Sequence, residues 1–422
     1  MSALAVDGGR LLADLDALSA IGRRGRGVER IAFGPDDVRA REWLAERLEE
    51  AGLEARIDGI GNVHGRWPSP RAVLAGSHVD SVARGGRLDG ALGVVAALEA
   101  ARALRAAGAC DAGVGLDVVA FADEEGTFRG TLGSRAFCGE VDDDELAAAG
   151  DAAGRSLGDA LAAAGWAGRP LERLDPARHV AYLELHIEQG PVLDRAGERL
   201  GVVTGIVGMR RFEVVFEGRA DHAGTTPPQL RRDAGAAAVR YATAFLDAVA
   251  RAGGPESVGN VGAVRLWPGA GNVVPERASV LVEYRDRAPE RLRALDAAVE
   301  PLAAAAAAQA RVEVAVTEVV RMAGVAMDPE LVAALGRAAE ACGAPARTMP
   351  SGAGHDAMVV GRHLPSGMLF APSIGGRSHC EEEETDPADL VLAARTLATA
   401  IAAVADRAAH GAQEGGTACA SS

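Results

Sequence analysis

The sequence predicts an α/β protein whose mixed-sheet domain is interrupted by a smaller α+β domain. In the first part of the chain, apolar runs that end in polar residues alternate with a long helical stretch, as strands and helices do in a largely parallel sheet. From about residue 209 apolar and polar residues alternate, and from about 325 the first pattern resumes. The length of 422 residues fits two or three domains.

The larger domain is expected over residues 1–208 and 325–411. It starts with a helical region over 11–52, in which DDVRAREWLAERLEEAGL has apolar residues at helical spacing. RAVLAGSHVDS then predicts a strand, GALGVVAALEAARALRAAG a helix, and VVAFADEEG a second strand, which is the order of a βαβ unit. A final helix is expected over 386–409, and the small, polar residues 412–422 are expected to be disordered.

Residues 209–324 are expected to form the inserted domain. RRFEVVFEGRADHAG alternates like a half-buried strand, helices are predicted over 233–252 and 289–310, and two antiparallel strands lie between these helices. With a last strand in ARVEVAVTEVV the order is β-α-β-β-α-β, which is similar to that of ferredoxin-like domains.

The charged residues exclude several functions. A net charge of −15 argues against a nucleic-acid-binding protein, which would carry a basic face. None of the 44 basic residues is Lys, so a Schiff-base lysine, a P-loop lysine and a lysine general base are all excluded. An anionic group of a substrate must therefore be bound by Arg, His or backbone N–H groups, and the planar Arg side chain suits a carboxylate.

The cysteines and the apolar runs indicate a cytoplasmic protein without a membrane partner. The five Cys include no CxxC pair, which fits reduced thiols and argues against a cysteine zinc site. The N-terminus has no basic region followed by an apolar one, so we expect no signal peptide. The most apolar run, LAAAAAAQA over 302–310, is short and predicts a helix and not a membrane span.

Five residues in separate motifs together indicate a site for two divalent metal ions. Each motif suits a ligand that leaves a strand or enters a turn, and open α/β sheets place their sites at strand ends. The residues are His78 in GSHVDS, Asp89 in GGRLDG, Glu125 in FADEEG, His186 in LELHIEQG and His379 in GGRSHCEEE. Asp89 has two oxygens and can bridge two metal ions, and the side chain of Asp80 can accept the second N–H of His78.

The adjacent acids Glu124 and Glu125 add a catalytic group to this site. Burying two neighbouring carboxylates is costly unless a cation offsets their charge. With Glu125 as a ligand, Glu124 is left as the general base for a metal-bound water, the chemistry of a metal-assisted hydrolase. Alone, each motif is more often a polar loop or a core histidine, and only the combination favours the site. Zinc is expected, with manganese, cobalt or nickel as alternatives.

The inserted domain supplies candidates of a different kind. His222 in ADHAGTTP has no metal-type partner nearby in the sequence and is assigned to oxyanion stabilisation. Asn272 in GAGNVVP can donate hydrogen bonds. Arg285 in VEYRDR can bind a carboxylate, or it can pair with Asp286 or Glu283.

The roles of two turns near the end of the larger domain are not decided by the sequence. Gly354 and His355 in SGAGHDA are candidates for the substrate side of the site, although this turn can also serve only to shape the loop. The four acids after His379 can be the N-terminal face of a helix, where carboxylates are stabilising. Among them, Glu383 is expected to support the site.

As a set, LHIEQGPVL, ADHAGTTP, GNVVP, SGAGHDA and GGRSH resemble the dinuclear-zinc M20 family of aminoacylases and carboxypeptidases, over about residues 25–405. More narrowly, the chain is similar to the hydantoinase/carbamoylase amidases, which include N-carbamoyl-L-amino-acid hydrolase, allantoate amidohydrolase and β-ureidopropionase. The resemblance implies a zinc-aminopeptidase-like fold for the larger domain. It also implies that the inserted domain acts as a lid, makes a homodimer and carries His222 into the partner's site.

Carried over by motif, the resemblance assigns the same five metal ligands, with Asp89 bridging and Glu124 as general base. It assigns substrate contacts to Gln189, His222, Asn272 and Arg285. Three positions depart from the family pattern: the order Phe128-Arg129, Pro228 where Met is usual, and Glu381 where Pro is common. All three are expected close to the cleft, where they affect the substrate and leave the metal chemistry intact.

The expected function is hydrolysis of a C–N bond other than a peptide bond, in an N-carbamoyl or ureido amino acid or an allantoate-like substrate. An M20 dipeptidase or aminoacylase and a specialised biosynthetic amidase are alternatives. A non-catalytic binding protein with the same fold would have lost the general base or a ligand, and this chain has lost neither.

Overall fold

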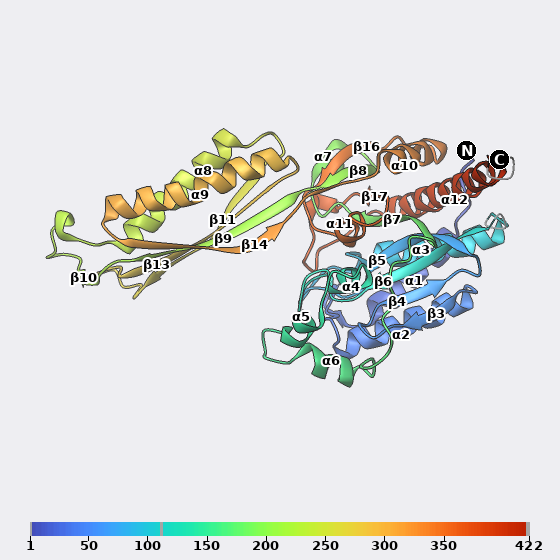
Figure 1. Ribbon diagram of the computed structural model, residues 1–422, viewed down its shortest axis with the longest axis horizontal. Helices are drawn as coiled ribbons and strands as arrows, with labels where there is room; N and C mark the ends of the chain where they lie inside the picture. The colour runs from blue at the N-terminus through green and yellow to red at the C-terminus, as the bar shows by residue number, and fades with distance from the viewer. Residues whose placement is uncertain (1, 110–112, 419–422) are drawn as a thin grey trace. The chain divides into compact units, whose positions relative to one another are not determined.

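The computed structural model of the chain describes residues 2–109 and 113–418. The chain forms two compact units (Figure 1). The first contains the residues up to Thr204 together with those from Ala326 on, and the second is the insertion Gly205–Val325. The boundaries expected from the sequence, 209 and 324, lie a few residues inside the insertion.

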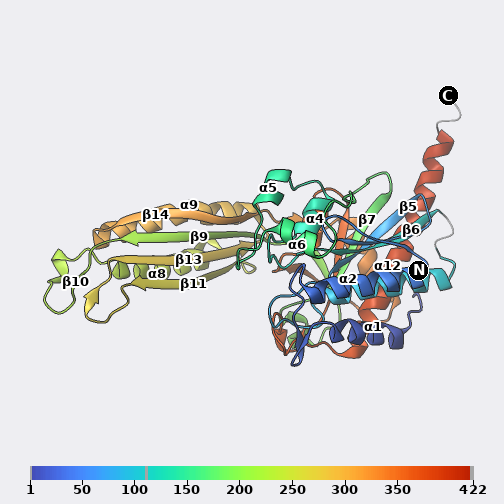
Figure 2. The same ribbon diagram turned by 90° about the horizontal axis from the view of Figure 1, so that it is seen from below.

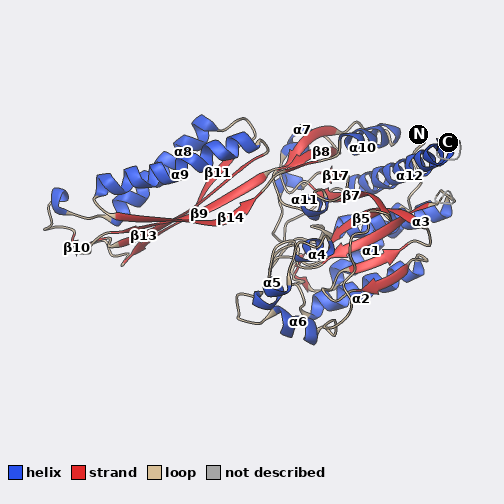
Figure 3. Ribbon diagram, viewed as in Figure 1, coloured by secondary structure: helices blue, strands red, loops and turns tan. Residues whose placement is uncertain are grey.

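The first unit is built on a nine-stranded mixed sheet (Figure 3). Its order is β15-β8-β17-β7-β5-β6-β4-β3, and β16 pairs with β8. The four central strands β17, β7, β5 and β6 run parallel to one another, whereas β8 is antiparallel to β17, β4 to β6 and β3 to β4. The strands are β3 (Glu54–Ile57), β4 (Val63–Arg66), β5 (Arg71–His78), β6 (Val114–Phe121), β7 (His179–Ile187), β8 (Gly201–Ile206), β15 (Val325–Ala326), β16 (Arg347–Ser351) and β17 (Ser366–Ala371).

Helices cover the sheet and bury the central strands almost completely. Every residue of β6 and β17 is buried, which explains why these strands are apolar runs and do not alternate. The longer helices α1, α2, α3, α10 and α12 contribute to one core cluster with the sheet, and a smaller cluster forms around Phe33, Phe128 and Trp166. The helices are α1 (Gly8–Ala20), α2 (Pro35–Glu50), α3 (Ala91–Ala106), α4 (Leu132–Phe137), α5 (Asp143–Ala148), α6 (Leu157–Ala163), α7 (Val192–Ala196), α10 (Pro329–Ala341), α11 (Asp356–Val360), α12 (Pro387–Ala418) and the 3₁₀ turn η2 (Ile374–Gly376).

The helical region expected over 11–52 is wrong as a single element. Helix α1 ends at Ala20, the short hairpin of β1 (Arg23–Arg24) and β2 (Gly27–Val28) follows, and α2 starts at Pro35. Gly22 adopts a positive φ of 77°, which ends α1, and Pro35 occupies the first turn of α2, where its missing N–H costs nothing. The βαβ unit of β5, α3 and β6 is confirmed, since β5 and β6 are parallel neighbours.

The closing helix is longer than expected. Helix α12 continues to Ala418, so most of the segment 412–422 that was expected to be disordered is helical, and residues 419–422 lie outside the described residues. Extending an existing helix gains a hydrogen bond for each residue added, which favours this continuation. Among the described residues, α12 is also the one helix long and apolar enough to cross a membrane, over Pro387–His410, but 67% of its 18-residue apolar window is buried, as in a core helix.

The second unit has the predicted ferredoxin-like arrangement. Its sheet order β14-β9-β13-β11 is antiparallel throughout, and α8 and α9 pack side by side against one face (Figures 1 and 2). Buried residues of both helices and of β9 and β13 form one core cluster. The elements are β9 (Gly208–Glu217), β10 (Asp221–His222), η1 (Pro228–Leu230), α8 (Ala234–Ala252), β11 (Val258–Trp267), β12 (Val273–Val274), β13 (Arg277–Asp286), α9 (Pro289–Ala310) and β14 (Glu313–Met322).

Candidate metal centre

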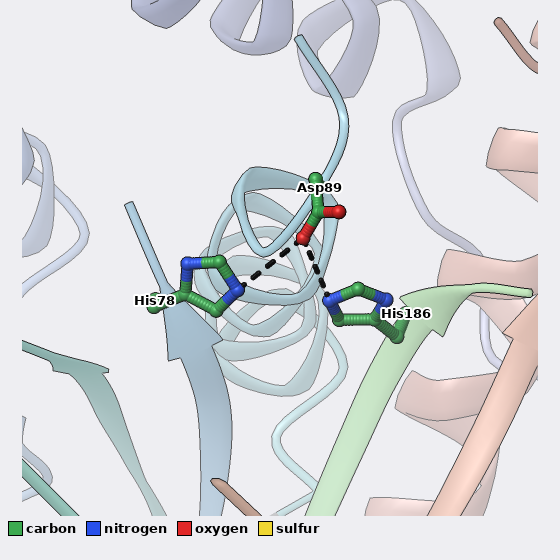
Figure 4. Close-up of side chains that lie close together, drawn as sticks. All are labelled: His78, Asp89 and His186. Carbon is green, nitrogen blue, oxygen red and sulfur yellow. Dashed lines mark ion pairs between the residues drawn. The ribbon is translucent and has the colours of Figure 1, made fainter. Parts of the chain in front are cut away.

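Two histidines and an aspartate meet at the carboxyl ends of neighbouring strands (Figure 4). His78 is the last residue of β5 and His186 is near the end of β7, and because these strands are parallel neighbours, both side chains reach the same edge of the sheet. Asp89 lies just before α3 and places Oδ1 3.4 Å from Nε2 of His78 and 3.3 Å from Nε2 of His186. Gly90, with φ 64°, allows this approach, since a Cβ there would lie 2.4 Å from the His78 ring.

A second group shares the same aspartate. His379 Nε2 lies 3.5 Å from Oδ2 of Asp89 and 3.4 Å from Oε2 of Glu125. His379 is half exposed and has a positive φ of 53°, an uncommon conformation for a residue with a side chain. This backbone conformation directs the imidazole out of its turn and towards Asp89 and Glu125. The fold therefore brings together all five residues named from the sequence, with Asp89 between the two groups.

Within each group, the donor atoms are spaced as the ligands of a single metal ion would be. Two ligand atoms at about 2.0–2.1 Å from a tetrahedral zinc ion lie about 3.3 Å apart. The four separations at Asp89 and His379 are 3.3, 3.4, 3.4 and 3.5 Å. Imidazole nitrogens and carboxylate oxygens are also the donors that zinc, manganese and cobalt accept, so the residues fit a pair of divalent ions.

Both buried imidazoles are oriented by backbone carbonyls. Nδ1 of His78 is 3.1 Å from the carbonyl oxygen of Asp80, and Nδ1 of His186 is 2.9 Å from that of Ile187. An N–H donated there leaves Nε2 of each ring facing Asp89. The expectation that the Asp80 side chain accepts the N–H of His78 is wrong, because the nearer Asp80 carboxylate oxygen is 3.9 Å away and the carboxylate has other partners.

These partners include a fully buried arginine that the sequence did not single out. Arg41 of α2 pairs with Asp37 at 2.9 Å and with Asp80 at 3.3 Å, and it also donates to the carbonyl oxygen of Phe121 at the end of β6. Asp80 in turn accepts the backbone N–H of Glu125 at 3.2 Å. Arg41 thereby links the end of β6 to the segment that follows β5, and no local sequence signal reveals this contact.

Glu124 lies beside the first group, with Oε2 3.7 Å from Nε2 of His78. Burial raises the pKa of Glu124 well above its usual value, against the effect of His78. Burial and the charge of Asp89 likewise raise the pKa of Glu125 to about 8. Burial would also raise the pKa of Asp89, but His186 and His78 hold it well below its usual value. A cation bound beside these adjacent acids would offset the cost of ionising them.

The turn that holds these two glutamates is built by Asp123, a second residue that the sequence did not single out. Asp123 is buried, has a positive φ of 55°, and its carboxylate accepts the backbone N–H groups of Thr127, Phe128 and Arg129. In the sequence, only its place in FADEEG, directly before two acids, could have indicated that Asp123 shapes this turn.

The structure places two further candidates against the ligands. Gln189, with φ 57°, donates from Nε2 to Oδ2 of Asp89 at 2.7 Å. His355 is buried, its ring centroid lies 4.5 Å from that of His186, and its Nε2 is 2.9 Å from Oγ of Ser351. In this structure His355 therefore packs against His186, while Gly354 lies exposed before it.

In the second unit, His222 and Asn272 are neighbours, because β10 pairs with β12. Nδ1 of His222 accepts the N–H groups of Gly224 and Thr225 at 3.0 and 3.2 Å. An accepting Nδ1 places the ring proton on Nε2, and the side chain is exposed. The carbonyl oxygen of Asn272 accepts the N–H of Ala223, which links the two turns.

Arg285 makes the ion pair that the sequence left as an alternative. Its Nε and Nη2 both lie 2.8 Å from Oε1 of Glu283, which also pairs with Arg211 on the neighbouring strand β9. Asp286, the other alternative, bonds instead to Ser257 and to the N–H of Ala288. About a third of the Arg285 side chain remains exposed.

The three departures from the family pattern lie in different surroundings. Phe128 is buried in the small cluster, with its ring 5.4 Å from that of Phe33, so its side chain packs in the core; that this position is close to the cleft stays a prediction. Its backbone N–H is bound by Asp123, and the turn directs the side chain into the core. Glu381 pairs with Arg84 at 2.6 Å, and Pro228 starts the exposed turn η1.

Asp356 is a buried acid that should make the stability of the metal-free protein depend on pH. Neither carboxylate oxygen has a hydrogen-bond partner of good geometry among the described residues, and burial together with Glu184 raises its pKa to about 8. Between about pH 4 and 8 the unfolded chain has lost this proton while the folded chain keeps it, so raising the pH lowers the free energy of unfolding.

We therefore expect Asp356→Asn to stabilise the metal-free protein at pH 7.5 relative to the wild type, and much less at pH 4.5. A full unit of pKa difference corresponds to about 1.4 kcal/mol, so an effect of a few kcal/mol is expected at the higher pH. Denaturant unfolding of both proteins at the two pH values measures it. A difference in stability that does not change with pH would contradict the raised pKa.

Comparison with known proteins identifies the class. The model of peptidase family M20/M25/M40 matches residues 74–403. The N-carbamoyl-L-amino-acid amidohydrolase of Paenarthrobacter aurescens is 39% identical, over 90% of this chain and 94% of its own length. The allantoate amidohydrolase of Escherichia coli K12 is 35% identical, over 88% of this chain and 92% of its own length.

The solved structures agree with this. An amidase of the hydantoinase/carbamoylase family from Burkholderia phymatum is 43% identical and superposes with a TM-score of 0.89, over 96% of this chain and 100% of that one. The chain belongs to peptidase family M20/M25/M40, whose members are metal-dependent hydrolases. The resemblance inferred from the motifs is confirmed, as is the mixed α/β fold.

Proposed function

We propose that this chain is an amidohydrolase that uses two divalent metal ions to cleave a C–N bond other than a peptide bond. The observation that carries the proposal is a single carboxylate, Asp89, shared by two ligand groups, with the buried Glu124 beside them. The names of the relatives point to N-carbamoyl amino acids and allantoate as the substrate class.

The first ion would be held by His78, Asp89 and His186, and the second by Asp89, Glu125 and His379. Such ions lower the pKa of a bound water and polarise the substrate carbonyl. We infer zinc as the native metal. Glu124 accepts the proton of the attacking water at its carboxylate and returns it to the leaving nitrogen, which its raised pKa suits.

His222 would stabilise the oxyanion from a second subunit. Nδ1 of its exposed ring already accepts two backbone N–H groups, and among the described residues Nε2–H has no hydrogen-bond partner, so it is available as a donor. A homodimer through the second unit is supported by β11, an edge strand that exposes Val258, Val264 and Leu266. Exposed apolar edges of this kind are suited to pairing with another chain. The free cysteines Cys138, Cys342 and Cys380 are consistent with a cytoplasmic enzyme.

If His222 acts in the partner's site, two inactive variants should complement each other. Chains with His222→Ala and chains with Glu124→Gln each lack one function, but a mixed dimer contains one site in which both functions are intact. We expect activity to reappear after the two are mixed and allowed to exchange subunits. No recovery in dimers shown by mass spectrometry to be mixed would contradict the proposed role across the dimer.

Arg285 distinguishes a charged from a neutral substrate. We expect Arg285→Ala to raise KM about ten- to a hundredfold for a substrate with a carboxylate, since a hydrogen bond to a charged group contributes about 1.5–3 kcal/mol. The amide of the same substrate should be affected little. Arg211→Ala is the matched control, because it also removes a partner of Glu283. Equal losses with the acid and the amide would mean that Arg285 has a structural role and does not bind the substrate carboxylate.

A substrate panel tests the proposed function. N-carbamoyl-L-amino acids, allantoate, ureidoglycolate, N-acyl amino acids and dipeptides are offered to the zinc-loaded enzyme, and the release of ammonia and free amine is measured. We expect turnover of a carbamoyl or ureido compound. Turnover of dipeptides or N-acyl amino acids alone would favour the alternative of a dipeptidase or aminoacylase.

A further inference from the structure

The four acids after His379 do not form the N-terminal face of a helix, since α12 begins only at Pro387. Three of them pair with arginines: Glu381 with Arg84, Glu382 with Arg377 and Glu384 with Arg87. Glu383 differs from these three. It is 3% exposed and has no arginine partner among the ion pairs of the described residues.

The Glu383 carboxylate is bound by the loop that carries the shared aspartate. Its Oε1 accepts two consecutive backbone N–H groups, those of Leu88 at 2.9 Å and Asp89 at 3.0 Å. Its Oε2 lies 2.9 Å from Oγ of Ser378, and the same Oγ lies 3.0 Å from Oδ2 of Asp89. Glu383 therefore binds Asp89 at its backbone N–H, and Ser378, whose single O–H can be donated to only one of the two carboxylates at a time, lies between their side chains.

Gly86 makes room for this contact. A Cβ added at Gly86 would lie 2.0 Å from the carboxyl carbon of Glu383, so even Ala would force the carboxylate away from the loop. The second glycine of the GGRLDG motif is thus explained by the close approach of Glu383, at a position where φ is not positive.

From this geometry we propose that Glu383 is a positioning residue for the metal centre, which fixes Asp89 between the two ligand groups and ties it to the turn of His379. The inference rests on the proposed metal site. Glutamine keeps the two backbone bonds, because its carbonyl oxygen can accept both N–H groups, and its amide can donate to Oγ of Ser378, which leaves the Ser378 O–H for Asp89. Alanine offers none of them and leaves two buried N–H groups without a partner.

The test is the affinity for zinc, measured by competition with a chromophoric chelator. We expect Glu383→Ala to weaken zinc binding about 10–100-fold, the usual effect of removing a residue that orients a ligand. Glu383→Gln should stay close to the wild type. Glu382→Ala, which removes an exposed acid from the same run, is the matched control and should have no effect.

A double-mutant cycle makes the assignment specific. Gly86→Ala should weaken zinc binding in the wild type but add little in the Glu383→Ala background, because the carboxylate it displaces is already gone. Gly86→Ala also carries the test if Glu383→Ala does not fold. Unchanged zinc affinity in both single variants, or equal losses in Glu383→Gln and Glu383→Ala, would overturn the proposal. Absence of zinc binding by the wild type would overturn the proposed function instead.

Discussion

Glu124→Gln should lower kcat by at least about 10²–10⁴-fold, the usual contribution of a general acid–base, while leaving metal content and KM close to the wild type. The reason is geometric: Glu124 lies 3.7 Å from His78 and belongs to neither ligand group. Glutamine keeps the size of the side chain but cannot take up a proton. Metal analysis and steady-state kinetics on the same preparations measure both quantities.

Glu125→Gln is the matched comparison, because it changes the adjacent residue in the same turn. Glu125 belongs to the group with Asp89 and His379, so this variant should lose metal affinity as well as activity. If instead Glu124→Gln lost metal and Glu125→Gln kept it, the two roles would have to be exchanged.

Hydrophobic patterning was sufficient to predict most of the fold. The βαβ unit around α3 and the β-α-β-β-α-β order of the insertion were predicted because each element has a regular period and a clear boundary. The region 11–52 was not, because α1 and α2 have similar helical patterns and the intervening hairpin is short. Only its glycines and Pro35 indicated the break.

That the five candidate ligands lie close together was predictable because each is anchored to a strand end or a turn, and the topology of the sheet brings such ends together. The residues that orient these side chains were harder to predict from the sequence. Arg41 is 37 or more residues away in sequence from every ligand, and its contacts with Asp80 and Phe121 exist only in the folded chain. Phe128 is near Glu124 in sequence, but its side chain packs in a separate core cluster, which the sequence did not indicate.

The sequence could also not decide between two partners of one side chain. Asp80 was assigned to His78 from their spacing, but the same two-residue spacing brings the carbonyl oxygen of Asp80 within 3.1 Å of the imidazole. The carboxylate is then available to Arg41 and to the N–H of Glu125. A buried arginine elsewhere in the chain decided this outcome.

Removal of the metal should abolish turnover and lower the stability of the protein, and the loss of stability should grow with pH. Without a cation, the raised pKa of Glu125, about 8, means that folding keeps a proton which the unfolded chain releases above about pH 4.5. Raising the pH towards 8 therefore destabilises the metal-free protein.

Bound metal replaces that proton, and the affinity of the protein for the metal rises with pH for the same reason. At a free zinc concentration of about 100 times Kd, each site adds about 2.7 kcal/mol. Thermal unfolding at pH 6 and pH 8, with and without zinc, should show the larger zinc-dependent increase in Tm at pH 8, and zinc, manganese or cobalt should restore activity after chelation. Full activity in a preparation shown by elemental analysis to be metal-free would rule out the proposed chemistry, and the assignment of Glu124 as the base for a metal-bound water would fail with it.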